Sequence, residues 1–239
     1  MIRWNLPGYD IVFTTRLGGV SRGPYASLNL GRHTGDDELN VDENRSRACA
    51  VVGADPLRLA LNRQVHSATV REAVPGAHDA GGDGLVTGEP GLPVLALAAD
   101  CLPIALARTG TAPGSGTSTG TSTEPRLVVL HAGWRGLLAG IVEAGVRALG
   151  PGPAAAMIGP AIGPCCYAVG ADVSDRFDVD LTNAGKLDLW SAAERRLTAA
   201  GIAAVERLDL CTACHPDLFF SHRRDEGVTG RQGVIGVIA

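Results

Sequence analysis

The chain has 239 residues, 45% of them hydrophobic and 19% charged, which is typical of a globular protein long enough to bury a sizeable core. Its formal net charge of −4 and its lack of a basic block argue against binding to nucleic acid or to an anionic membrane surface. No apolar stretch approaches the ~18 residues of a membrane span, and no export signal accompanies the six cysteines, so we expect a cytoplasmic protein with reduced or metal-bound thiols.

The N-terminal half is predicted to hold short strands joined by glycine-containing turns. A strand is expected at residues 9–15, followed by a turn at residues 16–19, where two glycines let a ligand approach the backbone. A helix is expected near residues 43–52, with Asp42 as its N-cap and Gly53 at its end. Further apolar runs predict strands at residues 57–61, 69–74, 84–87, 93–99 and 102–107.

Residues 109–125 form a low-complexity stretch of Gly, Ser, Thr and Pro. Such a composition has too few apolar side chains to bury the surface that ordering requires. We expect a flexible surface excursion between two core strands. A domain boundary is less favoured, because Cys101 before the stretch and His131 after it are predicted to belong to one site.

A buried strand at residues 127–130 ends on His131 and leads through a tight turn into a helix. Apolar residues recur at helical spacing from Leu138 to Leu149, which predicts one apolar helix face. The remaining sequence predicts a strand at 154–158, helices at 171–178 and 188–200, and strands at 204–211 and 234–238. Strands outnumber helices and do not alternate strictly with them. We therefore predict an α/β fold, a single domain over residues 1–239 with mixed β-sheets covered by helices.

Three apolar runs end on side chains that can bind a metal, namely His66, Cys101 and His131. Strand ends in α/β proteins are where reactive side chains meet solvent, so we hypothesise that these three meet in space. Two imidazoles and one thiolate suit zinc, and an open fourth position would let the metal lower the pKa of a bound water. The alternative is a pair of hydrogen-bonded core histidines with an inert buried thiol.

The other cysteines form weaker motifs. Residues 211–215, Cys-Thr-Ala-Cys-His, match the pattern of c-type haem attachment, but that modification accompanies export and no export signal is present. A zinc ribbon is not expected, because a second Cys-x-x-Cys is absent. Of the adjacent Cys165 and Cys166, at most one would face a pocket if they lie on a strand. Structural thiols are the preferred interpretation.

Several arginines beside glycine or loop backbone are candidates for binding phosphate through the planar guanidinium, namely Arg16, Arg135, Arg223 and Arg224. An isolated arginine is more often part of a surface ion pair. Asp100, next to Cys101, could carry a proton or orient a ligand. Other aspartates are interpreted as turn formers, namely Asp36, Asp37 and Asp83.

The motifs, taken in order, resemble the bacterial YfiH family, also called the multicopper polyphenol oxidase or laccase domain family, to which human FAMIN is related. The resemblance spans about residues 9–238 and rests on TTRLGGVS, SLNLG, HTGDD, QVHS, GGDGLVT, ADCLPI, HAGWRG, GPAIGPCCYAVG and CTACHPDLFFSHRRD. Ser67 stands where the family often has Gly, and the stretch at 109–125 is particular to this chain.

The resemblance implies a single α/β domain with mixed sheets, whose metal is bound by His66, Cys101 and His131. That metal is expected to be zinc, with copper able to enter the same site. The implied reaction is phosphorolysis of adenosine, inosine, guanosine or S-methyl-5′-thioadenosine, with deamination of adenosine as a second activity. The expected partners are therefore a purine nucleoside and phosphate, and no oligomeric state is predicted.

Roles for individual side chains follow from this chemistry as hypotheses. Asp100 is predicted to be catalytic as a proton carrier. Arg135 is predicted to be catalytic through contact with phosphate, and Arg16 to bind phosphate as well. Asn29 is predicted to contact the ribose hydroxyls.

Three other functions stay open from the sequence. A copper-dependent polyphenol oxidase is disfavoured, because the chain has six histidines and no His-x-His motif to build several copper centres. A non-catalytic zinc-containing binding module is an alternative, because fold resemblance does not prove turnover. A cysteine hydrolase using Cys101 and a histidine is the third.

Overall fold

Two mixed β-sheets packed face to face form the centre of the protein in the computed structural model, which describes residues 1–110 and 124–239. The first sheet has five strands, in the order β1 (Ile2–Leu6), β2 (Tyr9–Phe13), β13 (Gln232–Ile238), β6 (Val94–Ala98) and β3 (Ala60–Leu61). The second has six, in the order β12 (Ala204–Arg207), β9 (Ala154–Ile158), β7 (Leu102–Arg108), β8 (Leu127–Ala132), β5 (Gly84–Thr87) and β4 (Val70–Glu72). Both sheets contain parallel and antiparallel pairs.

Continuous apolar runs form the central strands because both faces of these strands are covered. In β8, Leu127 and Val129 pack in the core between the two sheets, whereas Val128 and Leu130 pack in the core beneath the helices. His131 is the next-to-last residue of β8 and is itself buried, so its side chain lies at the inner end of the strand. This is the position that the sequence analysis expected for a reactive side chain.

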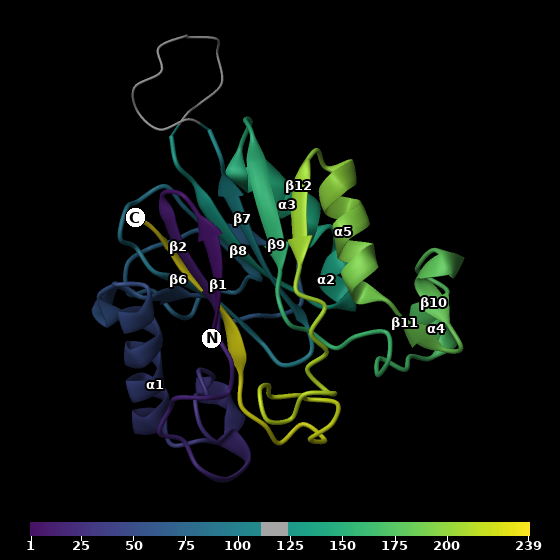
Figure 1. Cartoon of the computed structure of the whole chain (residues 1–239), viewed down its shortest axis with the longest axis horizontal. Coiled ribbons are helices and arrows are strands. Elements are labelled where there is room, and N and C mark those ends of the chain that lie inside the picture. Colours follow the sequence, from purple (N-terminus) through teal and green to yellow (C-terminus); the bar gives the residue numbers. More distant parts are fainter. Residues whose placement is uncertain (111–123) are drawn as a thin grey trace.

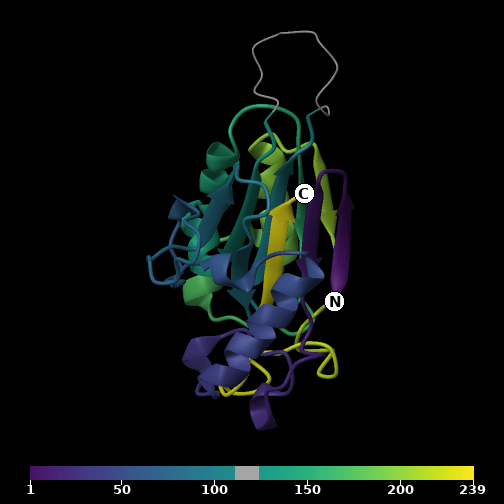
Figure 2. The ribbon, with the colours of Figure 1, turned by 90° about the vertical axis from the view of Figure 1, so that its left-hand side faces the viewer.

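Helices cover the outer face of each sheet (Figures 1 and 2). The five-stranded sheet is covered by α1 (Glu38–Val51). The six-stranded sheet is covered by α2 (Trp134–Ala139), α3 (Ile141–Leu149) and α5 (Leu189–Ala199). At one end lie the short helix α4 (Ala171–Ser174) and the hairpin of β10 (Thr182–Asn183) and β11 (Lys186–Leu187) (Figure 1). The predicted fold class is thus confirmed.

Two helix predictions need correction. The first helix begins at Glu38, not near residue 43, because the carboxylate of Asp37 accepts from the Leu39 N–H and caps it. Asp42, the predicted cap, lies inside the helix and pairs with Arg32. The helix expected up to Leu149 is two helices, since Gly140 adopts a left-handed conformation at φ 91° and ends α2.

The strands at 84–87 and 154–158 are confirmed, and α5 confirms the helix predicted at 188–200. Several elements are shorter than predicted, among them α4 in place of 171–178, β12 in place of 204–211 and β4 in place of 69–74. The strand predicted at 57–61 is reduced to β3, because Pro56–Arg58 form a 3₁₀ turn. The flexible surface segment predicted at residues 109–125 falls mostly on residues 111–123, which are not among the residues that the structure describes. The stretch joins β7 to β8, which are antiparallel neighbours. Within the described residues, none of the helices is long and apolar enough to span a membrane.

Candidate metal centre and its cleft

His66, Cys101 and His131, here called the trio, come together at one edge of the packed sheets. His131 lies on β8, Cys101 directly precedes β7, and His66 lies in the loop before β4. The candidate donor atoms of the three side chains all lie within 4.8 Å of one another. The Cys101 Sγ is 3.9 Å from His66 Nε2, and the two imidazole rings meet edge to face. The structure thus brings together the set that the sequence singled out.

The backbone turns sharply at two positions of this site. His66 has φ 60° and the residue before Cys101, Asp100, has φ 87°, both in the left-handed region that non-glycine residues seldom adopt. Asp and His are among the side chains that tolerate this region best. Such conformations persist only where surrounding contacts hold them, and they cluster at functional sites.

Asp83 supplies the contacts around His66. Its carboxylate accepts hydrogen bonds from the backbone N–H of His66 at 2.9 Å, from the N–H of Ser67 at 2.6 Å and from the Ser67 hydroxyl at 2.8 Å. The carboxylate also lies 2.9 Å from His131 Nδ1, so one aspartate orients both histidine segments. Burial alone would raise the pKa of Asp83, but the hydrogen bonds from His131 and Ser67 lower it to about 2.

This role of Asp83 was not predicted from the sequence, where the residue was interpreted as a turn former. The residue is almost completely buried, at 1% exposure, at the start of β5. The sequence did contain an indication of this role. The Gly-Gly-Asp-Gly run directly precedes an apolar strand, and a carboxylate that is buried at the start of such a strand needs hydrogen-bond donors around it.

The contact between Asp83 and His131 determines which imidazole nitrogen faces the trio. With Nδ1–H donating to the carboxylate, Nε2 carries the lone pair and is the atom that can bind a metal. Burial would lower the pKa of His131, yet Cys101 and Asp83 raise it to about 9. Burial would raise the pKa of Cys101, yet His131 and His66 lower it to about 6. Each side chain thus favours the charged form of the other, and a metal at Nε2 would take the place of a proton there.

This donor set fits a single metal ion. One thiolate and two imidazole nitrogens suit zinc, and they leave a fourth tetrahedral position for water or substrate. Gly133 permits the close approach of the turn after β8, since a Cβ there would lie 2.9 Å from Cys101 Sγ and 3.1 Å from His66 Cδ2. The trio also forms one end of a cleft, so the open position is accessible.

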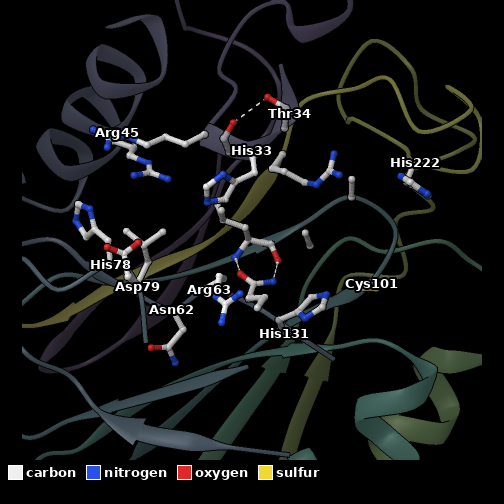
Figure 3. Close-up of a pocket in the computed structure, with 18 of the residues that line it drawn as sticks. His33, Thr34, Arg45, Asn62, Arg63, His78, Asp79, Cys101, His131 and His222 are labelled. Carbon is white, nitrogen blue, oxygen red and sulfur yellow. Dashed lines mark hydrogen bonds between the residues drawn. The ribbon is translucent and has the colours of Figure 1, made fainter. Parts of the chain in front are cut away.

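The cleft has a volume of about 480 Å³, within the range of small-molecule sites (Figure 3). Five of the six histidines of the chain line it, namely His33, His66, His78, His131 and His222. Four arginines line it against two carboxylates among the described residues; these are Arg32, Arg45, Arg63 and Arg231, with Glu38 and Asp79. The excess of cationic side chains favours an anionic ligand.

Arg45 is the most unusual of these arginines. It projects from α1, is only 6% exposed, and donates from Nε to the Leu30 carbonyl at 2.9 Å. Within the described residues no carboxylate lies at ion-pair distance from it, and burial is the first cause that lowers its pKa to about 10. A buried guanidinium without an ionic partner, facing a cleft, is placed to bind an anion.

Two predicted catalytic residues lie outside the lining of this cleft. The Asp100 carboxylate accepts from Thr212 Oγ1 and from the Arg223 N–H, both at 2.6 Å. These contacts tie the end of β6 to the C-terminal segment and do not aim the carboxylate into the cleft. Arg135 is exposed at the start of α2, with its guanidinium 4.3 Å from the centre of the Trp134 ring.

The two predicted substrate contacts are also engaged elsewhere. Arg16 donates to the carbonyls of Ala26 and Pro216 and stacks on Phe220, and it does not line the cleft. Asn29 is fully buried. Its amide donates to Asp36 and Thr34, and its oxygen accepts from the Arg231 N–H at 2.8 Å. Asn29 therefore shapes the wall of the cleft without reaching its interior.

The two packed mixed sheets, with a His-Cys-His group and a cationic cleft at their edge, define an α/β protein with a candidate mononuclear metal site. Residues 10–239 match the family described as Multi-copper polyphenol oxidoreductase laccase. The chain belongs to this family, and relatives from Shigella flexneri and Escherichia coli carry the name YfiH.

Named relatives are similar over nearly the whole chain. Purine nucleoside phosphorylase YlmD of Geobacillus stearothermophilus is 37% identical, covering 91% of this chain and 86% of the relative. Purine nucleoside phosphorylase YfiH of Escherichia coli (strain K12) is 34% identical, covering 96% and 94%. The crystal structure of the Geobacillus YlmD superposes with a TM-score of 0.84 at 35% identity, covering 98% of this chain and 93% of that one.

Proposed function

We propose that the protein is a zinc-dependent purine nucleoside phosphorylase. The observation that carries the proposal is a cationic cleft of about 480 Å³ lined by the trio and by Arg45, which has no carboxylate at ion-pair distance among the described residues. Phosphorolysis needs both elements, an anion site for phosphate and a polar site at the leaving base. The names of the relatives from Geobacillus and Escherichia coli support the same reaction class.

In this reaction an oxygen of phosphate bonds to C1′ of the ribose while the bond from C1′ to the purine nitrogen breaks. Arg45 and Arg63 line the cleft as candidate contacts of the phosphate oxygens. Asp79 and Glu38 are the carboxylates available to accept hydrogen bonds from ribose hydroxyls. Positive charge develops on the ribose as the bond breaks, and the bound phosphate and these carboxylates stabilise it electrostatically.

The departing base gains negative charge and needs a proton or an electrophile near it. His66, Cys101 and His131 would hold a metal ion that, when bound, would supply Lewis-acid chemistry there. His33 and His222 line the same cleft and are able to donate a proton. Asp83 holds His131 and the His66 segment in position, which limits reorganisation when substrate binds.

The proposed substrates are adenosine, inosine, guanosine and S-methyl-5′-thioadenosine, with deamination of adenosine as a second reaction. Deamination requires a proton carrier near C6 of the purine. Thr212 and Arg223 occupy the Asp100 carboxylate, so the cleft carboxylates Glu38 and Asp79 are the better candidates for this role.

A product assay tests the proposal. Purified protein of known metal content is incubated with each nucleoside, with and without phosphate, and the products are separated chromatographically. We expect free base that depends on phosphate and disappears both in His131→Ala and after metal removal. Inosine formed from adenosine without phosphate would add the deaminase. Absence of product from every nucleoside would overturn the proposal in favour of a binding module.

Two arginine variants localise the phosphate. Arg63→Gln removes a cation that lines the cleft and is expected to raise the apparent KM for phosphate about tenfold or more. Arg16→Ala removes a cation that lies outside the cleft lining and already donates to two backbone carbonyls. The apparent KM is expected to change less in Arg16→Ala, and the reverse order would return Arg16 to the phosphate site.

The polyphenol oxidase alternative is disfavoured by the donors present. Multicopper oxidation needs several copper centres built from many histidines. Within the described residues, only the trio and a group of four cysteines bring three or more metal donors together. The three other cleft histidines join neither group. The test is oxygen consumption by copper-loaded protein in the presence of a phenol. A rate equal to that of nucleoside cleavage would support the polyphenol oxidase.

A cysteine hydrolase is a second candidate, favoured by one specific arrangement. Cys101, His131 and Asp83 follow the order of nucleophile, base and orienting carboxylate. Such an enzyme needs no metal, so it would keep its activity after metal removal. Alkylation of the metal-free thiol would then abolish it. Retention of activity after alkylation would eliminate this candidate.

A further inference from the structure

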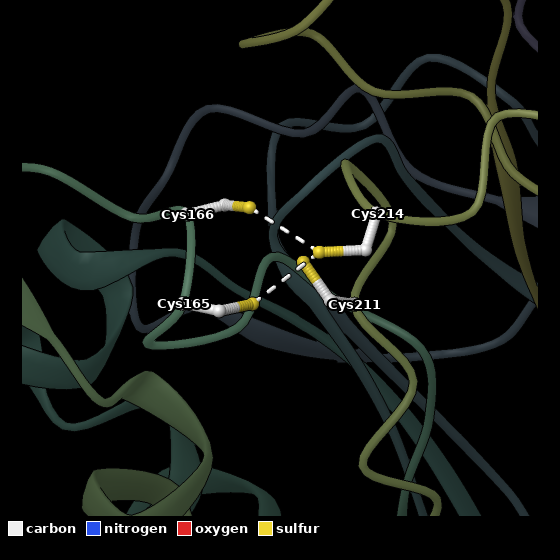
Figure 4. Close-up of side chains that lie close together, drawn as sticks. All are labelled: Cys165, Cys166, Cys211 and Cys214. Carbon is white, nitrogen blue, oxygen red and sulfur yellow. Dashed lines mark hydrogen bonds between the residues drawn. The ribbon is translucent and has the colours of Figure 1, made fainter.

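Four cysteines outside the trio converge at one point, although they come from two distant segments (Figure 4). Cys165 and Cys166 lie in the turn that follows β9, and Cys211 and Cys214 lie after β12. The four Sγ atoms all lie within 4.8 Å of one another. We call this group the cysteine cluster.

Both members of the adjacent pair face the cluster. The Sγ of Cys165 is 3.5 Å from that of Cys214, and the Sγ of Cys166 is 3.4 Å from the same atom. The expectation that at most one of them would face a pocket assumed a strand and is wrong. Residues 164–166 form a turn, so the strict alternation of neighbouring side chains does not apply.

The spacing of the sulfurs matches a metal tetrathiolate better than disulfides. Four sulfurs bound to zinc at ~2.3 Å lie about 3.8 Å from one another in a tetrahedron. A disulfide needs ~2.05 Å between two sulfurs and would pair Cys214 with one neighbour only. Here Cys214 is nearly equidistant from two sulfurs, and all four thiols are free.

The surroundings suit the negative charge of such a centre. The backbone N–H of Gly163 donates to the Cys211 Sγ at 3.2 Å, a contact that stabilises a thiolate. Lys186, the only lysine of the chain, places its ammonium against the carbonyl of Cys165 at 2.6 Å. A zinc ion with four thiolates carries a net charge of about −2, which a neighbouring cation offsets.

We propose that Cys165, Cys166, Cys211 and Cys214 bind a structural zinc ion, distinct from the metal of the trio. Four protein donors fill a tetrahedral shell, so this site has no position for substrate and serves the fold. It cross-links the loop after β9 to the segment after β12, which also meet through an isolated bridge between Ala161 and Cys211. Structural zinc of this kind contributes directly to folding.

The cross-linked segments also contact Asp100, the residue that precedes Cys101 of the trio. Thr212, between two of the ligands, donates to the Asp100 carboxylate, and the Ile162 N–H donates to the Asp100 carbonyl at 2.9 Å. Asp100 directly precedes Cys101 in the chain. Losing the structural zinc is therefore expected to loosen Cys101 without removing any ligand of the trio.

Metal analysis of the full chain tests the proposal. We expect about two zinc ions per chain in the wild type, one for each donor group. Cys214→Ser and Cys165→Ser should each lose about one zinc, and His131→Ala should lose the other. Cys49→Ser is the matched control, because Cys49 is a free cysteine on the buried face of α1 and belongs to neither donor group, and this variant should keep both ions.

Cobalt substitution provides a spectroscopic measurement that depends neither on enzymatic activity nor on whether a variant of the cysteine cluster folds. Cobalt bound by four thiolates has a much stronger sulfur-to-metal charge-transfer band than cobalt bound by one. We expect the strong band in wild type and in Cys101→Ser. A spectrum with one thiolate only, or four titratable thiols in a chain holding one zinc, would overturn the proposal. A disulfide found by non-reducing mass analysis of protein kept under inert gas would overturn it as well.

Discussion

The carboxylate of Asp83 joins two of the three proposed metal ligands, since its Oδ1 lies 2.9 Å from His131 Nδ1 and 2.9 Å from the backbone N of His66. Asp83 and His131 are held in register because β5 and β8 pair antiparallel, with Gly84 opposite Leu130. The backbone N–H of His131 donates to the Asp83 carbonyl at 2.7 Å, which closes the arrangement. The geometry of the trio therefore depends on one buried side chain that binds no metal itself.

Asp83→Asn is expected to weaken zinc binding by about 10–100-fold. An amide placed here has only one accepting oxygen, so its NH₂ faces a donor such as the N–H of Ser67, which lies 2.6 Å from a carboxylate oxygen in the wild type. The unmatched donors shift either the His66 segment or the His131 ring. Competition with a chromophoric chelator measures the zinc Kd.

The control for this variant is Asp79→Asn. Asp79 is a carboxylate in the same cleft, and within the described residues it makes no hydrogen bond to the trio. Its zinc Kd should stay within about twofold of wild type. Equal losses in both variants would mean that the charge of the cleft matters, and not the hydrogen bonds of Asp83.

Acid should remove a specific part of the stability through Asp83. Its pKa is lowered from 3.8 to about 2 in the folded protein, so its ionised form stabilises the fold above the unfolded value. That contribution, on the order of 2 kcal/mol, is lost as the pH falls from about 4 through about 2. Denaturant unfolding of metal-free protein across this range measures the loss. Metal-free Asp83→Asn should show a shallower fall, and parallel curves would contradict the assignment.

Gly133→Ala is expected to disturb the trio by direct contact. The new Cβ would lie 2.9 Å from Cys101 Sγ and 3.1 Å from His66 Cδ2, closer than van der Waals contact allows. We expect about a tenfold weaker zinc Kd and a loss of about 1–3 kcal/mol in the free energy of unfolding. Gly136→Ala, inside the helix that Gly133 precedes, places its new Cβ no closer than 3.4 Å to a neighbouring atom and should be tolerated. Similar effects in both variants would point to the helix and away from the metal ligands.

The sheets and the trio were predictable from the sequence because both follow from where apolar runs begin and end. Buried strands such as residues 154–158 are continuous apolar runs, and His131 and Cys101 mark the ends of two of them. Helix boundaries were less predictable, since Asp37 and Asp42 are equally suitable caps by residue type. Only the contacts of the folded chain distinguish them, through the pair that Asp42 forms with Arg32.

The cysteine cluster and the role of Asp83 depend on pairing between distant strands. Cys165 and Cys211 meet because β9 and β12 run parallel and their following loops leave the sheet together. No local spacing contains that information. The contacts predicted for Arg16 and Asn29 failed to reach the cleft for a related reason, because neighbouring loops supply backbone groups that occupy them.

Thr212→Val tests the link between the C-terminal segment and the trio. Thr212 is fully buried and its hydroxyl donates to Asp100 at 2.6 Å, whereas valine has nearly the same shape and cannot donate. Asp100 would keep only the Arg223 N–H, so the free energy of unfolding should fall by about 1.5–3 kcal/mol, the range for a bond to a charged group. Because Asp100 precedes Cys101, the zinc Kd of the trio should also weaken. Denaturant unfolding and chelator competition measure the two effects, and Thr198→Val, at an exposed site on α5, should change neither. A loss of stability with unchanged zinc affinity would confine Thr212 to the fold and separate it from the metal centre.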